Sequence, residues 1–296
     1  MKLAAVDIGS NAIRLQITNV IQYEGKYNFK KLEYLRFPLR LGKDVFNHKQ
    51  ISELNKRKFT ELMRAFKILI DLYEVDDCMV CATSAMRESS NGKEIAEWVK
   101  NEIGLKIHII DGNREAELIN KALYSYIDNR TYLHIDVGGG STELNIYKRS
   151  QKTASRSFKI GSVRSIDEKI TASLWRKMKS FIIDNLSQEH HVICIGTGGN
   201  INKVFELSNP RKNKRFLELT KIKEIQEYLE SFSYDERIHR LNLNEDRADV
   251  IIPATKIYTA AMEAANSKKM IVPDVGLKDG VMNFLFERNL NREKIK

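Results

Sequence analysis

The chain has 296 residues, of which 42% are hydrophobic and 30% charged, a composition typical of a folded globular protein that excludes a disordered or fibrous chain. No apolar run approaches the roughly 18 residues of a membrane-spanning helix, and Asp7 follows the start too closely for a signal peptide, so we expect a cytoplasmic protein without membrane contact. The net charge of +10 favours an anionic partner, although a solvated basic surface explains it equally well.

Strands and helices alternate along the sequence, which predicts an α/β protein. Ser52 is a good N-cap for the long helix that follows it. In chain order, we expect strands at 2–9, 12–21 and 29–40, a helix at 52–73, a strand at 78–85, a helix at 93–103, a strand at 106–111, a helix at 114–126, strands at 131–139 and 142–148, a helix at 171–187, a strand at 191–196, and then helices to the end.

Three cysteines, Cys78, Cys81 and Cys194, are too few for a disulfide scaffold. The CxxC spacing of the first two lies in a strand-like run, where positions three apart point to opposite faces. No second ligand pair accompanies them, so we interpret them as structural residues rather than a metal site.

Two segments of the sequence share one pattern. Residues 3–17, LAAVDIGSNAIRLQI, and residues 132–146, YLHIDVGGGSTELNI, both have an apolar strand, an Asp-aliphatic-Gly turn with small residues, and an alternating strand. Their offset is 129 residues (132 minus 3). A duplicated lobe explains the match, with each copy supplying one glycine-containing turn to a cleft between the lobes.

Both turns are followed by a strand, which argues against a dinucleotide-binding fingerprint, in which a helix follows. A turn of this kind can surround an anion with backbone N–H groups. Asp7 and Asp136 stand beside the turns, and a carboxylate next to a phosphate requires a cation between them. A third turn, at 195–203, ends a strand and opens a helix whose N-terminus favours anions. The three turns together indicate phosphate chemistry.

These motifs carry a resemblance to a known family. AAVDIGSNAIRL, ATSAMRESSNG, GNREAELI, IDVGGGSTEL, KIGSVR, IGTGGNINK, EDRADVIIPA and GLKDGV occur in the order and spacing of the Ppx/GppA exopolyphosphatase and guanosine pentaphosphate phosphohydrolase family. The resemblance implies an α/β fold of two actin-like (ribonuclease H-like) lobes with the active site in the crevice between them. We expect lobes at 1–127 and 128–296, with a C-terminal helix able to pack back on the first lobe.

The resemblance also implies the catalytic and metal-binding residues. Glu115 matches the family's catalytic glutamate, which activates water, although this chain has Arg114 where many relatives have a glutamate. Asp136 and Glu143 match positions associated with the metal, which we expect to be Mg²⁺. Without the resemblance, Glu115 reads as a surface residue of an early helical turn, and Asp136 as a cap for turn amides.

The expected phosphate ligands come from several motifs. Arg87 ends a predicted strand and offers a bidentate grip, and Arg14 and Arg247 match positions associated with guanosine polyphosphate binding. Asn200 replaces the usual Thr or Ser of the third turn. The full set is Ser10, Asn11, Arg14, Arg87, Gly138, Gly139, Gly140, Ser141, Gly198, Gly199, Asn200 and Arg247.

The function that the sequence favours is an exopolyphosphatase that uses Mg²⁺ to remove terminal phosphates from inorganic polyphosphate. The alternatives are a guanosine pentaphosphate (pppGpp) 5′-phosphohydrolase, a non-catalytic polyphosphate or alarmone sensor, and an actin-like kinase. Glu115 argues against the sensor, and the family-specific motifs argue against the kinase. We expect a homodimer that binds no nucleic acid, and a solvated loop for the basic segment 211–215.

Overall fold

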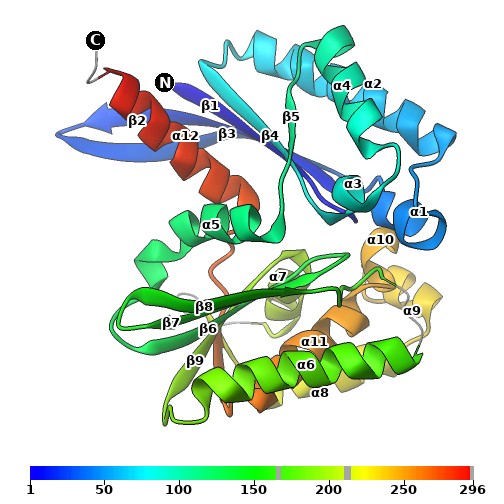
Figure 1. Ribbon diagram of the computed structural model, residues 1–296, viewed down its shortest axis with the longest axis vertical. Coiled ribbons are helices and arrows are strands. Elements are labelled where there is room, and N and C mark those ends of the chain that lie inside the picture. Colours follow the sequence, from blue (N-terminus) through cyan, green and yellow to red (C-terminus); the bar gives the residue numbers. More distant parts are fainter. Residues whose placement is uncertain (165–167, 210–214, 294–296) are drawn as a thin grey trace. The chain divides into compact units, whose positions relative to one another are not determined.

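The computed structural model describes residues 1–164, 168–209 and 215–293, which form two compact units. Unit 1 comprises Met1–Leu123 and Gly276–Lys296, and unit 2 comprises Tyr124–Val275 (Figure 1). The predicted lobes therefore differ from the units at both ends of the second lobe, because residues 124–127 group with unit 2 and the segment from Gly276 groups with unit 1. No helix within the described ranges is long and apolar enough to cross a membrane.

Unit 1 is built on a five-stranded sheet in the order β3-β2-β1-β4-β5. Its strands are β1 (Lys2–Ile8), β2 (Ile13–Tyr23), β3 (Lys26–Phe37), β4 (Asp77–Ala82) and β5 (Ile107–Ile109). The first three strands form an antiparallel meander, and β4 and β5 add to β1 in parallel. Every residue of β1 after Lys2 is buried, as is expected of a central strand covered on both faces.

The described part of unit 1 contains six helices beside this sheet. They are α1 (Leu41–His48), α2 (Glu53–Leu72), α3 (Ser84–Glu88), α4 (Gly92–Ile103), α5 (Gly112–Leu123) and α12 (Leu277–Glu293). Ser52 caps α2 as predicted, because its side chain accepts a hydrogen bond from the Asn55 N–H at 3.3 Å. The C-terminal helix α12 lies against β1 and β2 and packs along α5 (Figure 1).

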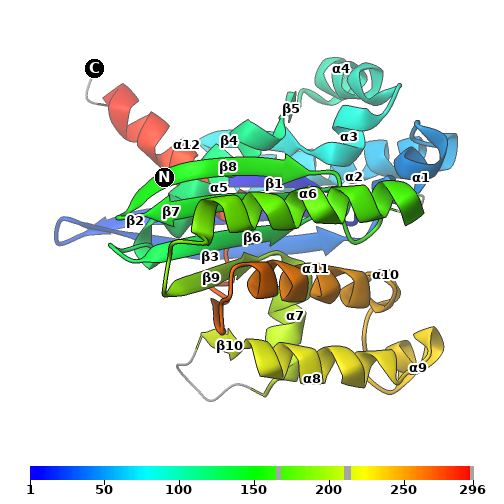
Figure 2. The ribbon, with the colours of Figure 1, turned by 60° about the horizontal axis from the view of Figure 1, so that its bottom comes forward.

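Unit 2 has a six-stranded sheet in the order β10-β11-β9-β6-β7-β8. Its strands are β6 (Thr131–Val137), β7 (Thr142–Lys148), β8 (Gln151–Phe158), β9 (Val192–Thr197), β10 (Phe216–Glu218) and β11 (Lys269–Ile271). Its helices are η1 (Tyr124–Tyr126), α6 (Glu168–Leu186), α7 (Gly199–Leu207), α8 (Leu219–Glu230), α9 (Tyr234–His239), α10 (Glu245–Ala248) and α11 (Ile251–Ala264). The helix α11 packs on α6, α7, α8 and β6, and Figure 2 shows it between the sheet and α8.

The core of unit 2 lies on one face of the sheet. Leu133, Ile135 and Val137 alternate along β6 and pack with helices α6 and α11. The intervening residues of β6, among them His134 and Asp136, therefore point to the opposite face. This alternation determines which side chains of the central strands are available to a site.

The duplication predicted from the sequence is confirmed by the topology. The order β3-β2-β1-β4-β5 in unit 1 corresponds strand by strand to β8-β7-β6-β9-β11 in unit 2, with the same parallel and antiparallel pairings. Even the irregularities coincide, since the register shifts between Ile17 and Thr18 in unit 1 and between Ile146 and Tyr147 in unit 2, 129 positions later (146 minus 17).

Several predicted boundaries were wrong. The strand expected at 78–85 ends at Ala82, and the short helix α3 replaces its last part, since Ser84 and Ala85 are already helical. The helix expected at 114–126 spans 112–123 and is followed by the 3-10 turn η1. The helix α1 and the strands β8, β10 and β11 were missed. Of the basic segment at 211–215, residues 211–214 lie outside the described residues.

Candidate active site

Two carboxylates face each other across the hairpin of β6 and β7 in unit 2. Asp136 and Glu143 are direct partners in the antiparallel register. Glu143 is only 3% exposed, and its Oε1 accepts hydrogen bonds from Ser141 Oγ at 2.6 Å and Ser157 Oγ at 2.9 Å. Like charges placed opposite each other in a sheet destabilise it, so this pair favours a cation or a shared proton.

The charges of this carboxylate pair affect the pKa of buried Tyr258. Its pKa is raised well above the usual value, first by burial and then by the charges of Asp136 and Glu143. The Tyr258 hydroxyl donates a hydrogen bond to the Thr197 carbonyl and accepts one from the Val137 N–H at 3.3 Å. The helix α11 thereby joins the ends of β6 and β9 beside the carboxylates.

The glycine turn between these strands has its carbonyl groups held from one side. The Gly138 N–H donates to the Ser141 carbonyl at 2.9 Å, which closes the turn. The segment after β8 donates to the carbonyls of the turn: Ser162 N–H to Gly138 (3.0 Å), Val163 N–H to Gly139 (2.9 Å) and Arg164 Nε to Gly140 (2.7 Å).

The N–H groups of the turn differ from its carbonyl groups in their hydrogen bonding. Within the described residues, no hydrogen bond engages the backbone N–H groups of Gly139 or Gly140. Since the carbonyl oxygens are fixed by the segment 162–164, these two N–H groups remain for an external acceptor. A turn that presents successive N–H groups can form a concave anion site.

The segment 159–164 supports the turn only because it carries a glycine. A Cβ atom at Gly161 would lie 2.4 Å from the Gly139 carbonyl oxygen. Such a distance is too short for any side chain, so Gly161 permits the close approach of the two loops. In the sequence, KIGSVR contributes only to the family resemblance. The supporting contacts of Gly161, Ser162 and Arg164 were not predicted, although the glycine was an available signal.

The third turn joins β9 to α7 within the same unit. Gly198 has φ of 109° and a built Cβ would lie 3.3 Å from Asp136 Oδ1, so glycine is required both by conformation and by space. Gly199 and Asn200 begin α7, as predicted. The guanidinium of Arg247 on α10 donates a hydrogen bond to the Gly199 carbonyl and thereby stabilises the turn.

A row of polar side chains crosses four strands next to the carboxylate pair. Ser155 Oγ donates to Asn145 Oδ1 at 2.7 Å, Asn145 Nδ2 lies 3.0 Å from His134 Nδ1, and His134 Nε2 lies 2.8 Å from Thr197 Oγ1. Burial lowers the pKa of His134 to about 3, so the ring is neutral. With Asn145 donating to Nδ1, the proton of His134 resides on Nε2 and is donated to Thr197.

The equivalent turn of unit 1 is closed in the same way. The Gly9 N–H donates to the Ala12 carbonyl at 3.2 Å, Gly42 N–H to Ser10 at 2.7 Å and Arg40 N–H to Asn11 at 2.9 Å. Ser10 is 3% exposed, and its Oγ shares a hydrogen bond of 2.8 Å with Ser84 Oγ. The two hairpin turns are therefore built on one backbone scheme.

Their charges differ, however. In unit 1 the partner of Asp7 across the hairpin is Arg14, whose guanidinium donates to Asp7 Oδ2 at 2.8 Å. Asp7 is therefore neutralised within its own hairpin, whereas Asp136 faces a second carboxylate. Of the two aspartates, Asp136 is the better metal candidate.

The other predicted residues of unit 1 lie on helices. Arg87, expected at a strand end, lies on α3 and donates to the Ile110 carbonyl at 2.6 Å. Glu115 is in the first turn of α5, where it is partly exposed. Arg114, the departure from the family pattern, pairs with Glu117 at 2.7 Å and stacks on Phe284 at 4.9 Å. Arg114 thus has a local structural role.

The charge of Glu115 contributes to the raised pKa of Cys81, a residue of β4 in unit 1. The pKa of Cys81 on β4 is raised to about 12, first by burial and then by Asp7, with a further contribution from Glu115. The charges of Asp7 and Glu115 thus both disfavour the thiolate form of Cys81. A thiol with such a raised pKa is protonated and unreactive, in agreement with the structural interpretation of this cysteine.

The predicted residues thus fall into two sets. Unit 1 carries Ser10, Asn11, Arg14, Arg87 and Glu115, and unit 2 carries Asp136, Gly138, Gly139, Gly140, Ser141, Glu143, Gly198, Gly199, Asn200 and Arg247. In unit 2 the set is compact, because two glycine turns flank Asp136. The paired carboxylates fit Mg²⁺, which prefers oxygen ligands and is commonly bound through one or two carboxylates.

Comparisons with known proteins agree with this arrangement. A model of the Ppx/GppA phosphatase family matches residues 20–288. The bifunctional 3-dehydroquinate synthase/phosphatase of Fusobacterium nucleatum is 28% identical over 96% of this chain and 46% of its own length. The guanosine-5′-triphosphate,3′-diphosphate pyrophosphatase of Photobacterium profundum is 22% identical over 94% and 58%. The chain thus spans about half the length of these curated relatives.

A solved structure extends the comparison to the fold. The exopolyphosphatase of Cytophaga hutchinsonii superposes with a TM-score of 0.85, at 21% identity, and the match covers 97% of this chain and 98% of that one. This likeness confirms the predicted α/β fold, and the repeated strand order agrees with the two predicted lobes.

Proposed function

Since the chain belongs to the Ppx/GppA phosphatase family, we propose that it is an exopolyphosphatase, which hydrolyses terminal phosphoryl groups of inorganic polyphosphate with Mg²⁺. The observation that carries this proposal is the glycine turn at 138–141, whose carbonyls are held by the segment 162–164 and whose N–H groups at Gly139 and Gly140 remain for an anion. A turn of this kind binds phosphate oxygens without an added side chain.

The paired carboxylates beside the turn are the proposed metal ligands. Asp136 and Glu143 would hold Mg²⁺, and Ser141 and Ser157 orient Glu143 through their hydrogen bonds. When bound, Mg²⁺ neutralises charge on the oxygens of the transferred phosphoryl group. One hairpin would then hold both ions, the anion at its turn and the cation between the ends of its two strands.

Glu115 is the proposed base. A carboxylate in the first turn of a helix suits a residue that orients water and accepts its proton, and the position matches the catalytic glutamate of the family that the chain resembles. Arg87 would bind a phosphate oxygen with the part of its guanidinium that does not contact the Ile110 carbonyl. The phosphate-binding roles of Ser10, Asn11, Arg14 and Arg247 remain predictions, as does the homodimer.

A second substrate is favoured by the comparisons. The relative from Photobacterium profundum is named for guanosine-5′-triphosphate,3′-diphosphate, whereas the superposed structure from Cytophaga hutchinsonii is named an exopolyphosphatase. A terminal phosphoryl group on pppGpp presents the same anhydride to the turn. We therefore keep pppGpp as the alternative substrate of the same site.

Orthophosphate release separates these possibilities. The protein is incubated with Mg²⁺ and either long-chain polyphosphate or pppGpp at matched concentrations of terminal phosphate, with EDTA as the control. Faster release from polyphosphate supports the proposal, and faster release from pppGpp moves the alternative to first place. Release from neither, together with tight binding of either, identifies a sensor and overturns the enzymatic proposal.

A further inference from the structure

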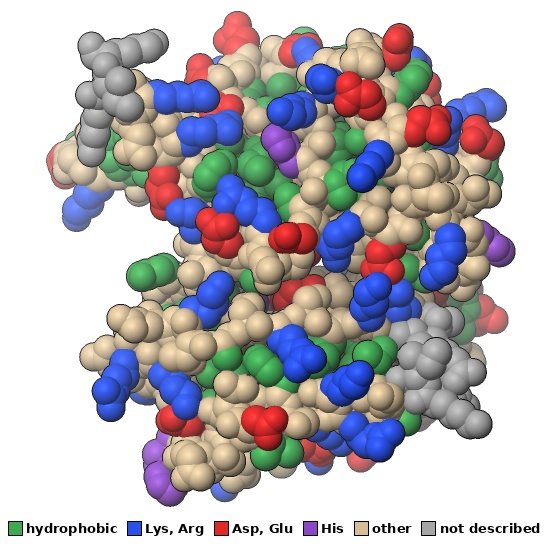
Figure 3. Space-filling model, viewed as in Figure 1, with side chains coloured by type: hydrophobic (Ala, Val, Ile, Leu, Met, Phe, Trp, Pro, Cys, Tyr) green, Lys and Arg blue, Asp and Glu red, His purple; other side chains and the backbone are tan. Residues whose placement is uncertain are grey.

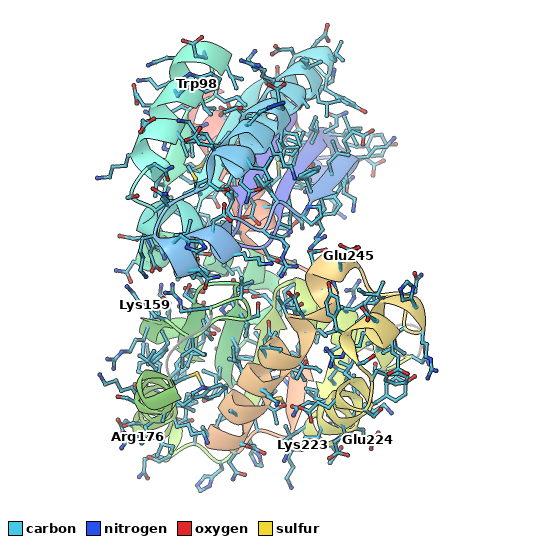
Figure 4. All side chains as sticks on the ribbon, turned by 90° about the vertical axis from the view of Figure 1, so that its right-hand side faces the viewer. Trp98, Lys159, Arg176, Lys223, Glu224 and Glu245 are labelled. Carbon is cyan, nitrogen blue, oxygen red and sulfur yellow. The ribbon has the colours of Figure 1, made fainter. Side chains whose placement is uncertain are left out.

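A groove on unit 2 lies between the edge strand β8 and the helix α6, and it belongs to none of the glycine turns. Its volume is about 410 Å³. Arg156 lines it from β8, and Arg176 and Lys177 line it from α6. Lys and Arg side chains gather over α6 in the lower half of Figure 3, and Figure 4 shows Arg176 on the outer side of this helix.

An aromatic contact positions the side chain of Arg156. Arg156 and Phe158 are two apart on β8 and share the face that packs toward α6. The Arg156 guanidinium lies 5.2 Å from the Phe158 ring centroid, and Phe158 in turn packs against Phe181 of α6 at 5.8 Å. The Arg156 side chain thus lies over the Phe158 ring, and its guanidinium lines the groove together with the cationic side chains of α6.

The charge of the groove is not balanced internally. Of the described residues that line it, three are cationic and one, Asp184, is a carboxylate, which accepts a hydrogen bond from Ser180 Oγ at 3.0 Å. Among the described parts of the chain, no salt bridge pairs Arg156, Arg176 or Lys177. Like charges brought together from two elements cost stability, and a bound anion offsets that cost.

We propose that this groove binds a segment of a phosphate chain, as a second subsite for the polyanion. Two guanidinium groups and one ammonium suit the oxygens of successive phosphates, and the hydroxyls of Ser173 and Ser180 add neutral donors at its wall. The subsite rests on the proposed function, because a phosphate chain is the substrate class proposed for the glycine turn. Nothing in it is required for the chemical step.

The test compares two lysines of one helix. Lys177 lines the groove, whereas Lys179, also exposed on α6, is not among its lining residues. The rate of acetylation of each lysine by acetic anhydride, a small amine-reactive reagent, is measured by mass spectrometry in EDTA, with and without tripolyphosphate. We expect tripolyphosphate to slow acetylation of Lys177 by about fivefold or more, since a bound anion engages the ammonium, and to leave Lys179 within about twofold. Equal protection of the two lysines, or protection of neither, would overturn the subsite.

Variants and other anions sharpen the result. Arg156→Ala and Arg176→Glu should abolish the protection of Lys177, while Arg156→Lys and Lys179→Glu should retain it. Long-chain polyphosphate should protect at lower phosphate concentration than orthophosphate, because several units bind together. Protection by orthophosphate at the same concentration would mean a site for a single free phosphate, and equal protection by single-stranded RNA would mean an unselective basic surface; each result contradicts the proposal.

The readout is independent of catalysis. A protein that protects Lys177 but releases no orthophosphate retains the subsite and loses the proposed function. An active protein without protection retains the function and loses the subsite.

Discussion

Arg14 and Glu143 occupy the same position in the two repeats of this protein. Each lies opposite the aspartate of its hairpin, Arg14 opposite Asp7 and Glu143 opposite Asp136. In the first repeat the pair is an ion pair of 2.8 Å, and in the second it is two carboxylates. One change of charge therefore distinguishes a hairpin that is neutralised internally from one that favours a cation.

Glu143→Gln is expected to have opposite effects with and without metal. In EDTA the free energy of unfolding should rise by about 0.5 to 1 kcal/mol, because a repulsive cross-strand pair is removed while the acceptor of Ser141 and Ser157 is kept. In an activity assay the Mg²⁺ concentration at half-maximal rate should increase, because an amide is a poorer ligand for Mg²⁺. Denaturant titration and a Mg²⁺ titration measure the two effects.

Asp7→Asn is the matched control, since it removes one member of the corresponding cross-strand pair in the other repeat. It should lower stability, because Arg14 is left partly buried without its partner. If both substitutions changed stability in the same direction, the proposed difference between the two hairpins would be wrong.

Gly161→Ala should weaken phosphate binding and destabilise unit 2. The added methyl group would lie 2.4 Å from the Gly139 carbonyl oxygen, so the supporting segment must move away from the turn. We expect a loss of about 1–3 kcal/mol, typical of overpacking, and an increased KM. Gly276→Ala is the control, because a Cβ there meets no atom within 4 Å. Equal stability of the two variants would show that the segment does not hold the turn.

The buried imidazole of His134 predicts a pH dependence of stability. Burial lowers the pKa of His134 from 6.5 to about 3, so the unfolded state binds a proton below pH 6.5 that the folded state does not bind. The stabilisation is complete above pH 6.5 and is lost as the pH falls toward 3. Between pH 6.5 and 5 the loss should be about 2 kcal/mol, measured by denaturant unfolding in EDTA.

His134→Val should remove this component of the pH dependence, whereas His191→Asn, at an exposed position, should keep it. His134→Asn provides a second variant in case the valine protein is too unstable. An unchanged slope in both His134 variants would mean that the ring is not held neutral by the fold.

Salt should distinguish the two substrates. Polyphosphate contacts the protein along several units, whereas pppGpp makes few contacts. The KM for long-chain polyphosphate should rise several-fold between about 50 and 200 mM KCl, and that for pppGpp should rise less. Equal salt slopes would contradict an extended cationic track.

Local sequence patterns predicted part of the site. The two hairpin turns were recognisable because their strands alternate and their glycines recur at one offset, and the turn before α7 was recognisable because a strand, two glycines and a helix follow in order. These features depend on residues that are close in the sequence. They can therefore be recognised before the fold is known.

Other features depended on tertiary contacts. The support of the turn by Arg164 joins residues 24 apart, and the contact of His134 with Thr197 joins residues 63 apart. The first depends on the packing of two loops, and the second on the register of β6 and β9. The strand β8 was missed because it is an exposed edge strand in which polar residues dominate, and α3 was missed because its five residues are too few for a helical period.

The measurement that tests the proposed mechanism most directly is orthophosphate release from long-chain polyphosphate by Glu115→Gln, with substrate binding measured in parallel. If Glu115 activates water, turnover should fall by roughly a hundredfold or more, while the dissociation constant for polyphosphate and the unfolding temperature stay close to those of the unmodified protein. Turnover equal to that of the unmodified protein would contradict the assignment of Glu115 as the base.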